Sequence, residues 1–126
     1  MRERFTDFCV YTIKHSDDLV QGRSGTFHEK RAWVTGKRLL EEAKRAKQVL
    51  PVVFCPAEGT KYLYAWAVLR KIDITEDGTN YTFEKLRLFR NPPPLKTTMK
   101  RKSDRKPLHR NFIRPYAICV TPAFLK

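Results

Sequence analysis

Two long alternating runs on either side of a short turn constrain the fold of this chain most. The first run, "KYLYAWAVLRKIDI" (residues 61–74), places Tyr62, Tyr64, Trp66 and Val68 on one face and Leu63, Ala65, Ala67 and Leu69 on the other. The second run, "NYTFEKLRLF" (residues 80–89), alternates as well, and Asp77-Gly78 between the runs is typical of a hairpin turn. We therefore predict that the two runs form an antiparallel β-hairpin.

Three further segments have the composition of strands. The segment "FTDFCVYTIK" (residues 5–14) is apolar on both faces, which predicts a first and largely buried strand. The segment "PVVFC" (residues 51–55) predicts a short apolar strand. In the last segment, "YAICVTPAFL" (residues 116–125), Ile118 and Val120 favour a closing strand in a central position of the sheet.

Only one segment predicts a helix. In "TGKRLLEEAKRAKQVLP" (residues 35–51), apolar residues recur at helical spacing at Leu39, Ala43, Ala46 and Leu50. Thr35 is a suitable N-cap and Pro51 a suitable stop. On the outer face, Arg38 stands four residues before Glu42 and Glu41 four before Arg45, and we interpret these charges as a solvated face.

The order of these elements predicts a single α+β domain over residues 1–126 with mostly antiparallel strands and one main helix. A chain of this length supports one core, and 41% of its residues are hydrophobic. Since the sheet is apolar on both faces and one helix cannot cover it, we expect a small β-barrel and not an open sandwich.

The charge balance points to an anionic partner. The chain has 26 Lys and Arg against 13 Asp and Glu, a formal net charge of +13 and a pI near 10.0. Such a field attracts polyanions, so nucleic acid is the expected partner, with RNA and DNA both open. A solubilising surface, an anionic membrane and an acidic protein are the alternatives.

The absence of certain sequence features leads to expectations about cellular location and cofactors. No continuous apolar core begins the chain and no run of about 20 apolar residues occurs, so we expect a cytoplasmic protein, with the nucleoid or nucleus as alternatives, and no membrane partner. Cys9, Cys55 and Cys119 are isolated and predict reduced, buried thiols. No phosphate loop or carboxylate cluster is present, so we expect no cofactor and no metal. We expect a monomer, although the sequence does not determine the oligomeric state.

A basic arm at about residues 91–114 is the first candidate site. It starts with three consecutive prolines, and from Lys96 to Arg114 it carries eight Lys or Arg against one acid, Asp104. A long cationic segment without periodicity is typical of an arm that contacts phosphates without reading sequence, and a solvated, partly disordered insertion is the alternative. The candidate contacts are Lys100, Arg101, Lys102, Arg105, Lys106 and Arg110.

The segment "QGRSGTFHEKRAW" (residues 21–33) is the second candidate. Its glycines, Gly22 and Gly25, permit tight backbone turns, and a cluster of polar side chains then precedes an aromatic one. We interpret it as the rim of a pocket, in which Glu29 accepts and Arg23, Lys30 and Arg31 donate hydrogen bonds, and a base stacks on Trp33. The alternative is an inert connection in which Phe27 and Trp33 belong to the core.

This segment resembles a family motif. "GRSGTFHEKR" has Gly22, Thr26, Glu29 and Arg31 and is similar to the Gly-x-Lys-Thr-x-Glu-x-Arg motif of ASCH domains, in the PUA-like superfamily. The motif's lysine is replaced around Ser24 and Gly25, and the spacing is about one residue longer. The resemblance implies a barrel of five or six strands with a cleft for RNA or a flipped base. EVE domains are similar and line that cleft with aromatics, which makes Trp33, Tyr64 and Trp66 candidate walls.

Two other functions stay open at this point. Some ASCH relatives hydrolyse a modified nucleoside with the motif lysine, its threonine and a distant glutamate, so the second function is a small nucleoside hydrolase or a ribonuclease on the same fold. By that resemblance Thr26, Lys30 and Glu29 are the candidate catalytic residues, with Thr26 as nucleophile and Glu58 or Glu84 as the acid or base. The third function is a basic subunit that only docks onto other proteins. Of the three, a nucleic-acid-binding module without catalysis is the expected one.

Overall fold

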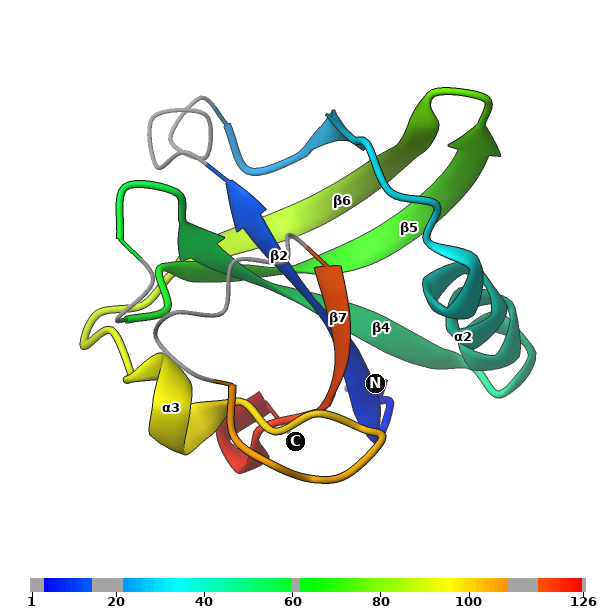
Figure 1. Cartoon of the computed structure of the whole chain (residues 1–126). Coiled ribbons are helices and arrows are strands. Elements are labelled where there is room, and N and C mark those ends of the chain that lie inside the picture. The colour runs from blue at the N-terminus through cyan, green and yellow to red at the C-terminus, as the bar shows by residue number, and fades with distance from the viewer. Residues whose placement is uncertain (1–3, 15–21, 60–61, 109–115, 126) are drawn as a thin grey trace.

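The computed structural model describes residues 4–14, 22–59, 62–108 and 116–125. Its strands, in chain order, are β1 (Arg4–Phe5), β2 (Phe8–Lys14), β3 (Gly25–Glu29), β4 (Gln48–Pro56), β5 (Ala65–Thr75), β6 (Gly78–Leu88) and β7 (Tyr116–Val120). The helices are α2 (Val34–Arg45), the short α3 (Leu95–Thr98) and a final 3-10 turn, η1 (Ala123–Leu125). This content confirms an α+β fold with one main helix (Figure 1).

All strands belong to one curved sheet. Its order is β3-β6-β5-β4-β2-β7, and β1 pairs with β4. Both β1 and β2 run parallel to β4, whereas the other pairings are antiparallel, as predicted for most of the sheet. Within the described residues no pairing joins β3 to β7. The sheet is therefore not closed, and the expected barrel is not confirmed.

The predicted hairpin is confirmed as β5 and β6. Thr75 pairs with Gly78 at the turn, and Gly78 has a φ of 135°, a conformation that side chains other than glycine's rarely adopt. The register between the strands shifts near Trp66 and again near Leu69. Lys85, beside the first shift, has a φ of 58°, as at a β-bulge.

The helix begins and ends earlier than the sequence predicted. Trp33, not Thr35, is the N-cap residue, and it makes no side-chain cap. The helix ends at Arg45 because Lys47 takes a left-handed conformation with a φ of 57°. Leu50 and Pro51 then lie buried in β4, so the predicted stop at Pro51 is wrong. The predicted helix was too long because Leu50 stands at helical spacing, although it is buried as part of the strand β4.

The predicted rim segment contains a strand. β3 pairs antiparallel with β6, with Thr26 opposite Thr82 and His28 opposite Asn80. The sequence had predicted an irregular loop here. Since β3 is an edge strand with exposed polar side chains at alternate positions, it lacks the apolar alternation that identified the other strands.

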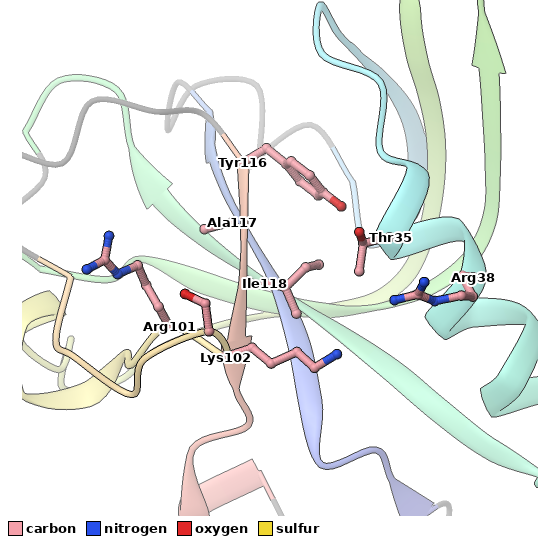
Figure 2. Close-up of a pocket in the computed structure, with 8 residues that line it drawn as sticks. Thr35, Arg38, Arg101, Lys102, Tyr116, Ala117 and Ile118 are labelled. Carbon is pink, nitrogen blue, oxygen red and sulfur yellow. The ribbon is translucent and has the colours of Figure 1, made fainter.

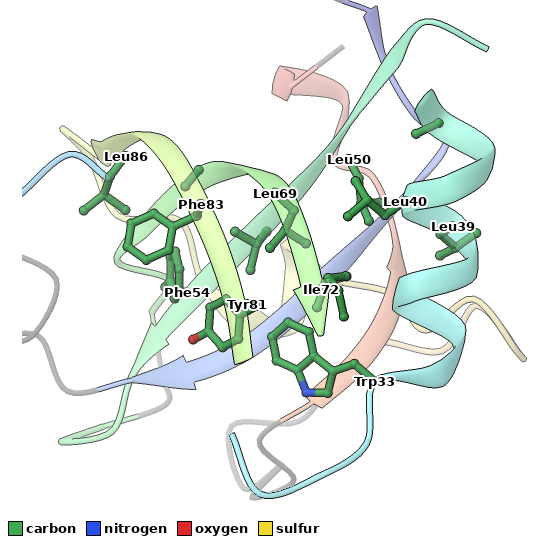
Figure 3. Close-up of a cluster of buried hydrophobic side chains, with 14 of the residues drawn as sticks. Trp33, Leu39, Leu40, Leu50, Phe54, Leu69, Ile72, Tyr81, Phe83 and Leu86 are labelled. Carbon is green, nitrogen blue, oxygen red and sulfur yellow. The ribbon is translucent and has the colours of Figure 1, made fainter. Parts of the chain in front are cut away.

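Two apolar clusters lie on opposite faces of the sheet. The first is covered by α2 and contains Trp33, Leu39, Leu40, Phe54, Tyr81 and Phe83 among others (Figure 3). The second contains Cys9, Tyr11, Cys55 and Cys119 from the strands and Leu125 from η1. All three cysteines are free and buried, as predicted. Alternate residues of β2 and β4 thus serve both clusters.

The basic arm is folded over its described part. Leu95, Met99 and Leu108 are buried in the second cluster. Its backbone pairs with the outer edge of β7, where the Lys102 N–H donates to the Ile118 carbonyl at 2.9 Å and the Val120 N–H donates to the Lys100 carbonyl at 2.8 Å. These contacts correct the expectation that the arm lacks local structure. The strand order corrects the position of β7, which lies at one end of that order and is not central.

Candidate functional site

A pocket of about 510 Å³ lies where α2, β7 and the basic arm meet. The first turns of α2 form one wall, the arm forms the other, and β7 forms the floor (Figure 2). The described residues that line it are Thr35, Arg38, Arg101, Lys102, Ser103, Tyr116, Ala117 and Ile118. Three of them are cationic and none is acidic, so the pocket suits an anion.

Two of the cations point toward one another across this α2–arm pocket. Arg38 extends from α2 and Lys102 from the arm, and their charged ends converge (Figure 2). The Nζ atom of Lys102 lies 4.9 Å from the centre of the Phe8 ring, a cation–π contact that orients it. Within the described chain neither side chain has an ion-pair partner. Two converging like charges repel, and an anion between them relieves that repulsion.

Arg101 has a different role from its neighbour. Its guanidinium donates to Oδ2 of Asp104 at 2.7 Å and points away from Arg38 and Lys102 (Figure 2). Asp104 also accepts the Lys106 N–H at 3.0 Å. That backbone hydrogen bond and the Arg101 charge lower the pKa of Asp104. Arg101 therefore holds the turn of the arm in shape, and Lys102 supplies the charge that is free for a ligand.

Tyr116 forms the aromatic part of the pocket. Its hydroxyl accepts the Gly36 N–H at 2.9 Å, which joins β7 to the first turn of α2. Its ring stacks on Trp33 with centroids 5.0 Å apart, and Trp33 stacks on Tyr81 at 4.3 Å. Burial raises the pKa of Tyr116, while the Gly36 N–H and the Arg38 charge act in the opposite direction. Trp33 thus covers one face of the Tyr116 ring, and Tyr116 also lines the pocket.

Trp33 is a core residue and not a stacking platform. It is fully buried, and its indole stacks on Tyr81 (Figure 3) and also on Tyr116. This corrects the expectation that a base stacks on it. Tyr64 packs against the first cluster and Trp66 against the second, where Trp66 makes an edge contact with Phe5 at 5.6 Å. Because these two lie on opposite faces of the sheet, they do not line one cleft, and that expectation is corrected as well.

Glu29 serves the fold. Its Oε2 atom accepts the Arg31 backbone N–H at 2.7 Å and the Trp33 Nε1–H at 3.1 Å. Thr79 supports the same turn, since its hydroxyl accepts the Trp33 N–H at 2.9 Å and donates to the Arg31 carbonyl at 2.7 Å. The carboxylate that we expected to read a base edge, or to act in catalysis, instead anchors Trp33 behind Tyr116.

The other residues predicted in residues 21–33 do not reach the α2–arm pocket. Thr26 pairs its hydroxyl with that of Thr82 at 2.9 Å on β6. Arg23, Lys30 and Arg31 are exposed, and none of them is among the described lining residues. Of the distant carboxylates, Glu84 pairs with Arg70 and Glu58 is exposed. The described contacts do not assemble these residues into a catalytic set.

The predicted arm cations divide by position. Arg101 and Lys102 line the pocket, whereas Lys100, Arg105 and Lys106 are exposed and are not among its described lining residues. Arg110 lies outside the described residues. The sequence missed six of the described lining residues: Thr35, Arg38, Ser103, Tyr116, Ala117 and Ile118. Arg38 was interpreted as part of a solvated face, and no sequence signal places the first turn of α2 beside a strand some 80 positions later, where Gly36 meets Tyr116.

No metal site is evident in the described part of the chain, where no group of three or more His, Cys, Asp or Glu residues could hold an ion. The cysteines are not available as reactive thiolates, since burial raises the pKa of Cys55 to about 11 and that of Cys119 to about 12. None of the described helices is long and apolar enough to cross a membrane.

No family model matches the chain, and no curated protein matches it.

Proposed function

We propose that this protein is a nucleic-acid-binding module that seats a phosphate of a bound strand in the α2–arm pocket. The observation that carries the proposal is the convergence of Arg38 and Lys102 in a pocket whose described lining has no carboxylate. A net charge of +13 supplies the long-range attraction that brings a polyanion to this surface.

The pocket also has a place for a base. Tyr116 and Ile118 give its floor an aromatic and an apolar surface beside the cations. A base that leaves its stack in single-stranded nucleic acid gains about 1–3 kcal/mol on an aromatic side chain. Tyr116 therefore takes the role that the sequence had assigned to Trp33, Tyr64 and Trp66. The arm supports the same interpretation, because its pairing with β7 holds Lys102 at a fixed position.

The proposal includes a PUA-like origin for the fold. The predicted elements keep their order, with β3 added before α2, and Trp33 stacks on both Tyr81 of β6 and Tyr116 of β7. In this proposal the sheet is a PUA-like barrel that is open between its edge strands, β3 and β7, with the aromatic stack packed between β6 and β7. A cytoplasmic location, or one in the nucleoid or nucleus, follows from the proposed ligand.

A salt titration tests the function. Fluorescence anisotropy measures the affinity for short single strands of RNA and DNA, and for a duplex, between about 50 and 200 mM salt. The double variant Arg38→Gln/Lys102→Gln is compared with Lys44→Gln/Arg45→Gln, which removes the same two charge types from the exposed last turn of α2. We expect the pocket variant to flatten the slope of log K against log salt by roughly 0.7 for each phosphate of a single strand that it no longer neutralises.

Two results would contradict the proposal. If the unmodified protein binds none of the three ligands at the lowest salt, the nucleic-acid function fails. If the pocket variant and the control variant lose affinity equally, the overall positive charge of the protein accounts for nucleic-acid binding and the pocket makes no specific contribution. Comparison of the RNA and DNA affinities decides between these two partners.

A further inference from the structure

We infer that the α2–arm pocket prefers the terminal phosphate of a nucleic-acid strand to an internal phosphodiester. The inference rests on the proposed function and specifies its ligand. Its basis is the number of free cations: Arg38 and Lys102 converge, while Arg101 is neutralised by Asp104.

Charge matching favours a monoester. A phosphodiester carries one negative charge and leaves one of the two cations unneutralised. A terminal phosphate carries about −1.5 to −2 at pH 7 and offers three acceptor oxygens. Arg38 and Lys102 together balance that charge, and both are donors whose hydrogen bonds strengthen when the acceptor is ionised.

Neutral donors complete the set. Thr35 and Ser103 line the same pocket, one from α2 and the other from the arm, so each wall has a cation and a residue that carries a hydroxyl. A terminal phosphate has enough oxygens to accept from both walls at once. A phosphodiester uses two of its oxygens as ester links and has only two left to accept these hydrogen bonds.

The size of the pocket extends the ligand beyond phosphate. Its volume of about 510 Å³ exceeds that of a phosphate group, and Tyr116, Ala117 and Ile118 line it beside the cations. The end nucleoside fits there, against the aromatic and apolar floor. The rest of the strand then continues over the exposed cations of the arm, Arg105 and Lys106, which follow the pocket residues in sequence.

Oligonucleotides that differ only at their ends test the inference. One short single strand is prepared with a 5′-phosphate, with a 3′-phosphate, and with hydroxyls at both ends, and each is measured against the unmodified protein. We expect one phosphorylated form to bind about tenfold more tightly than the hydroxyl form, the gain of one net charge-assisted hydrogen bond. In Arg38→Gln/Lys102→Gln this ratio should fall toward one, and in Lys44→Gln/Arg45→Gln it should persist.

The possible results distinguish a failure of the terminal-phosphate preference from a failure of nucleic-acid binding. Equal binding of the three strands overturns the terminal-phosphate preference and leaves nucleic-acid binding intact, whereas no binding of any strand removes both. A preference that survives in the pocket variant places the phosphate elsewhere and overturns the inference. A nucleoside monophosphate is the final comparison: if it binds as tightly as the phosphorylated strand, the ligand is a free nucleotide and the assignment to a strand is wrong.

Discussion

Substituting Gly78 with alanine should destabilise the protein more than any exposed substitution. A Cβ atom at this position would lie 2.2 Å from the Glu29 carbonyl oxygen and 2.8 Å from the Lys30 carbonyl group, and both obstacles are backbone. No side-chain rotation relieves such a clash. The segment that leads from β3 to Trp33 must move, or the tip of the hairpin must.

The magnitude follows from two contributions. A non-glycine residue at a φ of 135° costs about 1–3 kcal/mol, and displacing the packed backbone costs about 1–3 kcal/mol more. For 126 residues, 1 kcal/mol corresponds to roughly 4 °C in Tm, so Gly78→Ala should lower Tm by roughly 8–24 °C. Since Glu29 anchors the indole behind the pocket, the folded fraction should also bind oligonucleotide more weakly.

Thermal unfolding followed by circular dichroism measures this loss. Gly59→Ala is the matched control, because a Cβ there meets no atom within 4 Å. Its Tm should stay within about 2 °C of the parent, the range of a surface substitution. If Gly78→Ala melts within about 4 °C of the parent, the backbones of the two segments do not approach each other as closely as the structure shows, and the reasoning is refuted.

Three further predictions concern the folded state. Lys47→Gly should stabilise by about 0.5–1 kcal/mol in urea unfolding, because glycine adopts the left-handed φ at the end of α2 without strain; an unchanged midpoint would contradict this. Glu29→Ala should cost about 1–3 kcal/mol and weaken binding, since the Trp33 indole N–H loses its acceptor, whereas Glu29→Gln keeps an acceptor and should cost less; equal losses would refute the anchoring role. Stability should fall as the pH rises above 9.0, the ordinary pKa of a thiol, toward about 11 and 12, the pKa values of buried Cys55 and Cys119. In that range the unfolded chain loses thiol protons that the folded protein keeps. Urea midpoints that stay level from pH 8 to pH 11 would contradict this prediction.

Local chemistry made the hairpin and the first strand predictable. The alternation on either side of Asp77-Gly78 is long enough to exclude a helix, and the turn of the structure, Glu76-Asp77, lies only one position before that predicted pair. The end of α2 was not predictable by the same means. Leu50 continues the helical spacing, and only the left-handed backbone at Lys47, a residue with no special preference for it, redirects the chain into β4.

The site was harder to predict because its parts come from distant segments. The arm was recognised by its charge, and Arg101 and Lys102 do line the pocket. The opposite wall of the pocket forms because α2 lies close to β7, where the Gly36 N–H donates to the Tyr116 hydroxyl. No local sequence pattern predicts this contact. Composition also misled at Trp33: an aromatic beside a polar cluster is typical of a binding surface, but two tyrosines enclose it in the core.

The enclosed indole gives this protein an optical probe of its own. Trp33 and Trp66 are the two tryptophans of the chain, and they lie on opposite faces of the sheet. In Trp66→Phe, emission therefore comes from an indole stacked directly behind the ring that faces the pocket, with centroids 5.0 Å apart. A ligand that shifts the Tyr116 ring changes the quenching of that indole. Unlabelled oligonucleotides can then be titrated by intrinsic fluorescence, with no dye attached to the end whose phosphate is in question.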